Sequence, residues 1–589
     1  GPHEVSKMQR LLRFLVIGVT VLIAAPVAVS GSTPATSSVT VPTAAGSTVS
    51  DAWTGTAPPA SFPASTCFPG GTPLVDEHAV TIAVAPGTYD TVGATFTFNA
   101  TWTPASGDPS TNDLILTLIG PDGLEIDSSD GGAPSETVVA HNLAAGTYRV
   151  VVCGFLNTTA QPYAGSLTIA TSAIVVPPSN VLPAAGKTWG KPVKVTPTNG
   201  YGYEPSFIVD RYGNAFATAH KENWQLALAP DANSPTATRS MSWAWLSIDN
   251  GKTWADPPGL TPASLEQHQV GDEGDMTQDD AGHIYFADTY AGDITLTRWS
   301  TNGLGAITFD YTRPTIPTPE DDDRPWVIAH GDGHVFYFAN AGNKLLNGGR
   351  YTVHASYDGG LTWDSLGVPL PDSGWCRPAA DHRAGSKLLY VACTNDGGKL
   401  YSFVSTDDGR TFQRYDMGTY NNADGTQSWP TIQVGPDGTV WVLYVDSNDV
   451  GDGGIPNTNR LYLFRSRDAG RTWTKQDVTP VVGRYQYGWL SLTPDGKTLG
   501  LGIYYRPNAG YAWSVAGTTW AAGGKINAKT FVDLDIDHAV SPAENAEPPG
   551  DYLGSYFFPD GKLGVIWTRY VLWTSAATLE RDIYFAKQR

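Results

Sequence analysis

The chain has 589 residues, too many for one ordinary hydrophobic core, and this length predicts two or three domains. Charged residues make up only 16% of the chain while Gly (64), Pro (43), Trp (19) and Tyr (27) are abundant, which favours a turn-rich all-β protein over a helical one. The formal net charge of −20 repels phosphate backbones, so nucleic acid is excluded as the expected partner.

Residues 1–30 have the pattern of a secretory signal peptide. Arg10 and Arg13 form a basic head, and the apolar run Phe14–Val29 leads to small residues suited to cleavage. An uncleaved membrane anchor is the alternative, because the run is nearly long enough to span a bilayer. Both predict a secreted or cell-surface protein of bacterial type, with membrane contact only through this segment.

Residues 31–63 consist mainly of Ser, Thr, Ala, Pro and Gly, and we expect a flexible linker there. Residues 64–175 alternate apolar and polar residues in runs such as "HAVTIAVA" and "ATFTFNATWT", which predicts a small antiparallel β-sandwich. Its stretches "LTLIGPDG" and "AGTYRVVVCG" resemble the bacterial pre-peptidase C-terminal domains, jelly-roll-like modules attached to secreted enzymes. The resemblance implies an accessory domain without a catalytic set.

The four cysteines fall into two local pairs. In an exported protein we expect a disulfide between Cys67 and Cys153 and a second between Cys376 and Cys393. The second pair adjoins Arg377, so that bond would brace the chain beside a charged residue.

Repeats occupy the remaining residues, 176–589. Seven units each place two strands around an Asp/Gly-rich turn, as in "PTIQVGPDGTVWVLY". The last unit ends with one strand whose partner is missing, and "GKTWGKPVKV" at 186–195 supplies it. We therefore predict a seven-bladed β-propeller that the 186–195 strand closes.

Four turns carry the complete motif Ser-x-Asp-x-Gly-x-Thr-Trp/Phe, beginning with "SIDNGKTW". The motif resembles the Asp box of sialidases, xyloglucan-cleaving enzymes, sortilin-type receptors and photosystem assembly factors, with a six-bladed sialidase-type propeller as the alternative fold. The Asp carboxylate can accept turn N–H groups and Gly allows positive φ, so we expect a structural role. The carboxylates are those of Asp249, Asp358, Asp407 and Asp468.

The repeat register also selects one residue per blade at the start of the first strand, where the central mouth of a propeller lies. These seven residues are Glu204, Glu273, Arg324, Arg377, Trp429, Tyr487 and Tyr552. They could pair with one another and hold the rim, or they could bind and process a ligand.

The sialidase resemblance implies arginines that hold a sugar carboxylate through two parallel hydrogen bonds. Arg324 and Arg377 would have this role, a third arginine would be Arg506 or Arg569, and Trp429 would contribute to substrate binding.

The same resemblance implies a tyrosine nucleophile with a carboxylate base. Tyr552 or Tyr487 would attack, Glu204 would be the base, and Glu273 or Asp275 would be the acid.

The sequence thus favours a secreted, monomeric glycosidase of the sialidase superfamily that acts on extracellular glycans, with an acidic sugar as substrate. One alternative is a non-catalytic propeller that binds glycans or proteins at the cell surface. Another is a polysaccharide lyase in which His220 and Tyr290 supply the base. No cofactor is expected beyond a structural calcium ion at "DDDR" (Asp321–Arg324) or at "DSNDVGDGG", which begins at Asp446.

Overall fold

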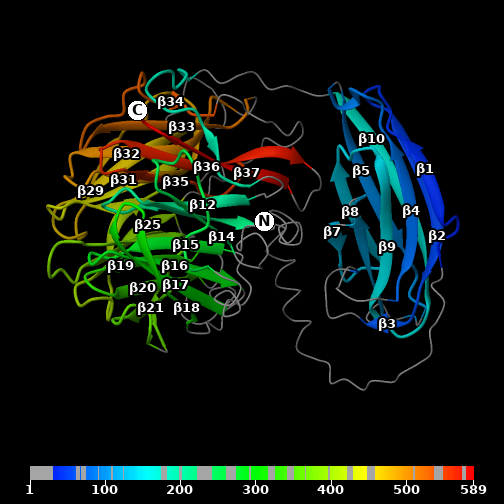
Figure 1. Ribbon diagram of the computed structural model, residues 1–589, viewed down its shortest axis with the longest axis horizontal. Helices are drawn as coiled ribbons and strands as arrows, with labels where there is room; N and C mark the ends of the chain where they lie inside the picture. The colour runs from blue at the N-terminus through cyan, green and yellow to red at the C-terminus, as the bar shows by residue number, and fades with distance from the viewer. Residues whose placement is uncertain are drawn as a thin grey trace. The chain divides into compact units, whose positions relative to one another are not determined.

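The fold was obtained as a computed structural model (Figure 1). The structure describes residues 31–61, 67, 74–90, 92–105, 107, 111–121, 123, 125–173, 182–197, 202–221, 242–260, 273–290, 293–315, 325–340, 351–364, 366–395, 398–420, 429–447, 458–508, 511–535, 548–573 and 579–589. The predicted signal peptide or anchor at 1–30 lies outside these residues, and among the residues described no helix is long and apolar enough to cross a membrane. The chain divides into two compact units, Gly1–Val176 with Leu572–Glu580 and Pro177–Val571 with Arg581–Arg589.

The first unit is a sandwich of two β-sheets that share one hydrophobic core. The first sheet runs in the order β1 (Thr36–Thr40), β4 (Asp76–Ala83), β9 (Gly146–Asn157), β6 (Asn112–Ile119) and β7 (Glu125–Ser129), with β3 (Ala60–Ser61) beside β9. The second runs in the order β2 (Thr48–Ala57), β10 (Gln161–Ala173), β5 (Val92–Thr101) and β8 (Ser135–His141). A single 3-10 turn, η1 (Thr88–Asp90), precedes β5.

The predicted linker at 31–63 is wrong, because this segment holds two strands of the sandwich. β1 pairs in parallel with β4, and β2 pairs antiparallel with β10 along its whole length. Val39, Val41 and Trp53 are buried in the core between the sheets. A few large apolar residues are enough to hold β1 and β2 in the sandwich, because the partner strands β4 and β10 supply most of the buried surface.

The second unit consists of seven antiparallel sheets in its described part. The first sheet holds β12 (Gly202–Val209), β13 (Ala215–Lys221) and β14 (Trp243–Ser247), and the second holds β15 (Glu273–Gln278), β16 (His283–Tyr290), β17 (Asp293–Gly303) and β18 (Ala306–Pro314). The third holds β19 (Trp326–His330), β20 (His334–Asn340), β21 (Tyr351–Ser356) and β22 (Val368–Leu370), and the fourth holds β23 (Cys376–Ala380), β24 (Leu389–Thr394), β25 (Lys399–Ser405) and β26 (Gln413–Thr419). The fifth holds β27 (Thr431–Val434), β28 (Val440–Ser447), β29 (Asn459–Ser466) and β30 (Thr474–Asp477), and the sixth holds β31 (Arg484–Leu492), β32 (Thr498–Arg506), β33 (Ser514–Ala521) and β34 (Val532–Asp533). The seventh is β35 (Gly554–Phe557), β36 (Leu563–Trp573), β37 (Leu579–Lys587) and β11 (Val193–Lys194).

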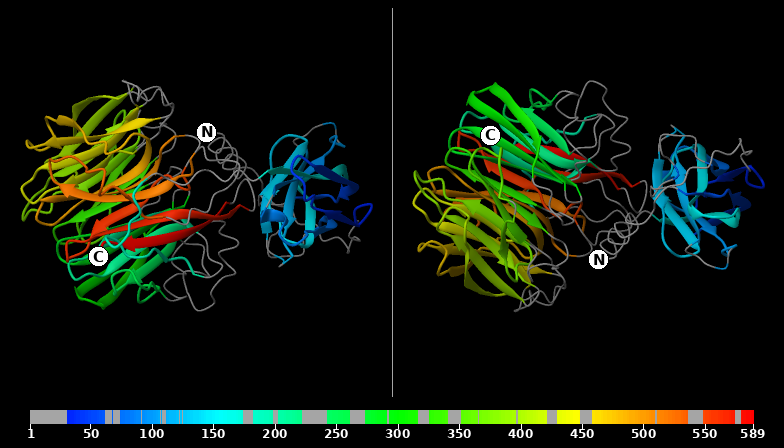
Figure 2. Two further views of the ribbon diagram at one scale, coloured as in Figure 1. Left: turned by 90° about the horizontal axis from the view of Figure 1, so that it is seen from above. Right: turned by 90° about the horizontal axis from the view of Figure 1, so that it is seen from below.

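The first strands of these sheets form a closed ring. β12, β15, β19, β23, β27, β31 and β35 each contact the next, and β35 returns to contact β12. Figures 1 and 2 show β12, from the start of this unit, beside β35 and β36 from its end. This arrangement is that of a β-propeller, and the predicted all-β class, with a β-sandwich that precedes the propeller along the chain, is confirmed.

Strand β11 completes the last sheet. Val193 pairs with Phe585 and Lys194 with Tyr584, and an isolated bridge joins Trp189 to Gln588. The orphan "GKTW" therefore lies against the C-terminal strand and covers its free edge, which would otherwise expose unpaired backbone groups.

The Asp boxes are closed hydrogen-bonded turns. In the first box, Asp249 Oδ1 accepts hydrogen bonds from the Ser247 hydroxyl (2.9 Å) and from the N–H groups of Lys252 and Thr253 (both 3.0 Å). Asp249 Oδ2 accepts the Thr253 hydroxyl at 2.7 Å. The boxes of Asp358, Asp407 and Asp468 repeat the bonds from the Ser and Thr hydroxyls and from the Thr N–H. These carboxylates are thereby occupied by the turn itself.

Both predicted disulfides are present. Cys67 is bonded to Cys153 in the sandwich, and Cys376 to Cys393 in the propeller. Cys376 and Cys393 are directly opposite each other in the β23–β24 pair, so the bond joins the two strands one residue before Arg377.

Candidate active site

Two of the predicted mouth residues have unusual backbone conformations. Glu204 in β12 has φ of 53° and Tyr487 in β31 has φ of 52°, a region that side chains with a Cβ rarely adopt. In each case the pairing with the next strand shifts register at that point. A bulge re-aims a side chain, and such strain concentrates at functional sites. Both strands are therefore distorted at the position that the repeat register selects.

Glu204 belongs to a group of four polar side chains, in which His220 comes from the same sheet, Glu273 from the next sheet, and Tyr552 from the segment just before β35. His220 in β13 places Nε2 3.3 Å from Glu204 Oε2 and 3.4 Å from Glu273 Oε1. The Tyr552 hydroxyl lies 3.4 Å from His220 Nε2 and donates a hydrogen bond of 3.2 Å to Glu273 Oε1. Glu204 Oε1 accepts the Asp551 N–H at 2.8 Å. These four side chains, from Glu204, His220, Glu273 and Tyr552, are called the acid cluster below.

The acid cluster is almost completely removed from solvent, with exposed fractions of 2–6%. Burial, followed by the nearby charges of Glu273 and Glu204, raises the pKa of Tyr552 well above its ordinary value. The phenol is therefore protonated at rest and can act as a nucleophile only if its proton leaves during the reaction. Glu273 already accepts the hydrogen bond from that hydroxyl, which gives it the position of the base that the sequence assigned to Glu204.

Arg377 lies beside the acid cluster without forming an ion pair to it. Its guanidinium carbon is 3.6 Å from the ring centre of Trp326, 3.8 Å from that of Trp489 and 5.4 Å from that of Tyr552. Within the described part of the chain, no hydrogen bond or ion pair of 4.0 Å or less involves this guanidinium, and its Nε is buried without a partner. The predicted pairing of rim arginines with rim glutamates is therefore not found at Arg377.

Burial lowers the pKa of Arg377 to about 10, and the nearby carboxylate of Asp275 opposes that shift. The guanidinium is thus still charged at neutral pH. Asp275 itself is bound into the framework, since Oδ1 accepts the Ser206 hydroxyl (2.6 Å) and Oδ2 the Val327 N–H (3.0 Å). Burial raises the pKa of Asp275 despite these bonds. With both oxygens occupied by the framework, Asp275 is poorly placed to donate a proton to a substrate.

Two predicted arginines have neighbours of their own. Arg569 forms an ion pair with Asp535 and lies 3.8 Å from the ring centre of Tyr584. Arg506 lies 4.5 Å from the ring centre of Trp513, and burial together with the charge of Arg484 lowers its pKa to about 10.

The aromatic members of the predicted ring are packed together. Trp429 and Tyr487 belong to the same buried core as Trp326 and Tyr552, and the rings of Trp429 and Trp326 are 5.9 Å apart. Through Trp326 and Tyr552, this core adjoins the guanidinium of Arg377.

Several predicted residues cannot be placed. Arg324, the "DDDR" segment and most of "DSNDVGDGG" lie outside the described residues, as does the side chain of Tyr290. Asp446, at the start of the second acidic segment, is buried in β28.

The sequence reading missed two residues that hold Arg377, namely Trp326 and Trp489. A signal for them exists, because blades three to six each carry a tryptophan near the start of the first strand, in "RPW", "GWC", "SWP" and "GWL". His220 was predicted only as a lyase base, whereas it contacts both glutamates.

No protein-family model matches the sequence, and no curated protein matches it. Solved structures are similar at low identity. A protein of unknown function from Dyadobacter fermentans is 13% identical with a TM-score of 0.36, over 68% of this chain and 99% of that one. The NanB sialidase from Streptococcus pneumoniae is 14% identical with a TM-score of 0.32, over 85% of this chain and 94% of that one. An α-L-arabinanase from Penicillium chrysogenum is 15% identical with a TM-score of 0.31, over 70% and 98%. Similarity at this level assigns neither activity nor substrate.

Proposed function

We propose that the propeller unit is a glycoside hydrolase whose active site is the acid cluster together with Arg377. One observation carries the proposal: the buried Tyr552 hydroxyl donates to Glu273 beside an arginine that has no carboxylate partner within 4.0 Å among the described residues. A purely structural rim would be expected to neutralise a buried arginine by a direct ion pair, because an unpaired buried charge is costly. A site that binds an anionic substrate leaves that partner to the ligand.

The substrate we propose is a glycan with an acidic sugar. Arg377 presents a planar set of N–H donors, and a carboxylate lying in that plane accepts two of them in parallel. Trp326 and Trp489 lie within 4 Å of the guanidinium and fix its orientation. An acidic sugar bound there would place its ring beside Tyr552, whose own ring is 5.4 Å from the guanidinium carbon.

The chemistry follows from the two carboxylates. The Tyr552 oxygen attacks the anomeric carbon while its proton passes to Glu273, and the glycosidic C–O bond breaks. Glu204 acts as the acid that protonates the departing oxygen. Water then hydrolyses the glycosyl–tyrosine bond, with Glu204 as base and the proton on Glu273 returning to Tyr552. His220 Nε2 contacts both carboxylates and so positions them relative to each other.

A polysaccharide lyase is the second candidate, because His220 Nε2 and the Tyr552 hydroxyl lie 3.4 Å apart and such a pair could abstract a proton next to a sugar carboxylate. The two reactions differ in their products. A hydrolase releases a saturated sugar and consumes water, whereas a lyase leaves a double bond in the new end.

The test is mass spectrometry of a panel of acidic and neutral glycans after incubation with the full chain, Glu273→Gln and Arg377→Met. Arg383→Met is the matched control, since Arg383 pairs with Asp381 in the turn between β23 and β24. Saturated acidic sugar from the parent and the control, but from neither site variant, supports the hydrolase. Unsaturated product indicates the lyase, and glycan binding without any product indicates a non-catalytic binding propeller.

A further inference from the structure

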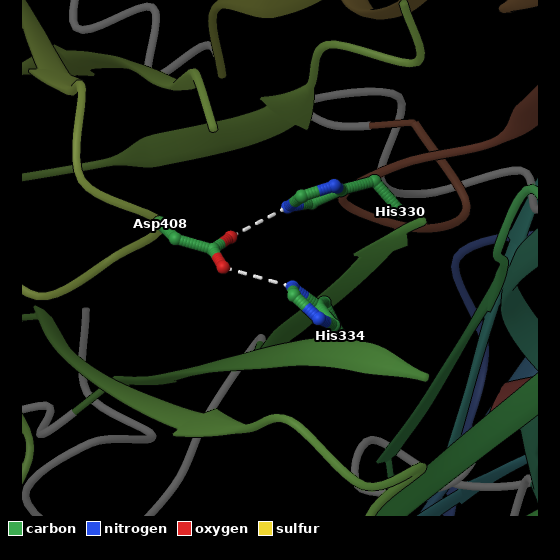
Figure 3. A group of neighbouring side chains, drawn as sticks. All are labelled: His330, His334 and Asp408. Carbon is green, nitrogen blue, oxygen red and sulfur yellow. Dashed lines mark hydrogen bonds and ion pairs between the residues drawn. The ribbon is translucent and has the colours of Figure 1, made fainter. Parts of the chain in front are cut away.

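A second group of polar side chains lies at a turn away from the acid cluster. His330 ends β19 and His334 begins β20, and they are cross-strand partners around the turn 331–333. Asp408 comes from the neighbouring sheet, where it follows Asp407 within the Asp box. Figure 3 shows both imidazoles directed at the carboxylate of Asp408. These three residues are called the His–Asp cluster below.

The distances within the His–Asp cluster are short. His330 Nε2 is 2.8 Å from Asp408 Oδ1, and His334 Nδ1 is 2.8 Å from Asp408 Oδ2. His330 and Asp408 are 4% and 2% exposed, whereas the His334 side chain is 34% exposed. The cluster therefore has a buried floor and one side that opens toward solvent.

One of the two contacts does not have hydrogen-bond geometry. His334 Nδ1 is buried and, among the described residues, makes no hydrogen bond, although it lies within 2.8 Å of Asp408 Oδ2. A buried polar atom that is close to a carboxylate but misaligned with it calls for an explanation.

The propeller fold does not need these side chains. In the first two sheets, the residue at the position of His330 is an aspartate that caps its own turn, Asp210 or Asp279. The box position of Asp408 is Asn250, Gly359 and Ala469 in the other three boxes, and each of the four residues has positive φ. An Asp box thus forms equally well without a carboxylate there.

We propose that His330, His334 and Asp408 bind a divalent transition-metal ion of the Zn²⁺ class. Two imidazole nitrogens and one carboxylate are a ligand set that Zn²⁺ uses, with a water molecule in the remaining position. The open side at His334 gives the ion a path of entry and room for that water. Because the ligands belong to the third and fourth sheets, the ion would join these two sheets.

Other groups nearby are less suited to this role. The carboxylate of Asp279, close to His283, is already occupied: Oδ1 accepts three backbone N–H groups and Oδ2 accepts the hydroxyl of Tyr285 and the N–H of Gly333. Arg410 approaches Asp408 Oδ2 to 4.0 Å, but its side chain is 56% exposed and can move away when a cation binds.

The test uses the full chain, freed of metal by a chelator and titrated with ZnCl₂ alone by isothermal calorimetry, with bound zinc counted by elemental mass spectrometry. We expect Asp408→Asn and His334→Gln to weaken zinc binding at this site by at least about tenfold. His382→Gln is the matched control, because His382 pairs with Asp280 in a neighbouring turn and should leave binding unchanged. Zinc should also raise the melting temperature of the parent and the control, but not of the two cluster variants.

A second zinc ion at Glu204, His220 and Glu273 would be recognised because Glu273→Gln removes it and Asp408→Asn does not. The proposal is overturned if the parent binds no more zinc than Asp408→Asn, or if His334→Gln and the control behave alike. His334 is partly exposed, so His334→Gln keeps the experiment decisive even where Asp408→Asn does not fold. Circular dichroism of the metal-free proteins establishes which variants are folded.

Discussion

The carboxylates of the Asp boxes and those of the acid cluster have opposite environments. In the box, Asp468 is well exposed, and the hydroxyl and N–H of Thr472 together with the Ser466 hydroxyl donate to it. In the acid cluster, Glu273 is buried and contacts two titratable side chains, Tyr552 and His220. The first arrangement fixes a turn, and the second leaves protons free to move. The comparison teaches that the carboxylate shared by all four Asp boxes has a structural role, whereas the buried carboxylates of the acid cluster are candidates for catalysis.

The largest expected effect tests whether the acid cluster is catalytic. Glu273→Gln removes the acceptor for the Tyr552 proton while keeping the size of the side chain. On a glycan that the parent cleaves, we expect kcat to fall by about 10² to 10⁴, the usual contribution of a general base. Steady-state kinetics measure this, and Tyr552→Phe should be at least as damaging.

Asp468→Asn is the control for this measurement, and its kcat should equal that of the parent. If Glu273→Gln retains full activity, the acid cluster is not the catalytic site, and the contrast between the two kinds of carboxylate would have no bearing on function.

Much of the propeller could be predicted because its evidence is repeated along the chain. The turns, the boxes and the missing partner of the last strand are local patterns, and the count of strands was enough to predict that the 186–195 segment pairs with the last strand. The disulfides were predictable because only two local pairings exist. Register also placed Glu204, Glu273, Arg377 and Tyr552 near one another, since equivalent positions of a repeat meet around one axis.

The remaining features depend on contacts that no repeat encodes. Whether Tyr552 donates to Glu273 or to Glu204 is decided by side-chain packing between the first, second and last sheets. The strands at 36–40 and 48–57 were missed because their own composition resembles a linker, and the surface that buries them comes from β4 and β10. Trp326 and Trp489 were missed because a tryptophan at a strand start is ordinarily part of the core.

The next effect concerns the disulfide beside Arg377. Replacing Cys376 and Cys393 with alanine opens a link between positions separated by 17 residues. For a closed loop of that size we expect a loss of about 3 kcal/mol in the free energy of unfolding. Denaturant unfolding of the oxidised parent and the double variant measures it, with reduction of the parent as the matched control.

The same variant sharpens the comparison, because Arg377 neighbours the bond and the boxes do not. We expect KM for an acidic substrate to rise while kcat changes less, since the position of a binding group is loosened. An unchanged KM would show that the tryptophans alone hold Arg377.

A smaller effect is expected in the boxes. Asp358→Ala removes an acceptor that receives hydroxyl and N–H donors at 2.5–3.0 Å. We expect the free energy of unfolding to fall by about 1.5–3 kcal/mol, the range for hydrogen bonds to a charged group, and activity per folded molecule to stay the same. Thermal unfolding together with active-site titration separates the two. A loss of activity in the folded fraction would contradict the structural role of the boxes.

The smallest effect is a pH dependence that comes from the box carboxylates. The hydroxyl and N–H of Thr472 stabilise the charged form of Asp468 and lower its pKa from 3.8 to about 2. Because the folded value lies below the unfolded one, the stability from these bonds is present above pH of about 4 and is lost as the pH falls toward about 2. Carbon-detected NMR titration of the Asp468 carboxyl should give a midpoint near 2 in the parent, and Thr472→Val should move it toward 3.8, since the donor of the largest contribution is removed. If the midpoint is already near 3.8 in the parent, the box bonds do not favour the charged form. The difference from the acid cluster would then come only from burial, which raises the pKa of Tyr552 there.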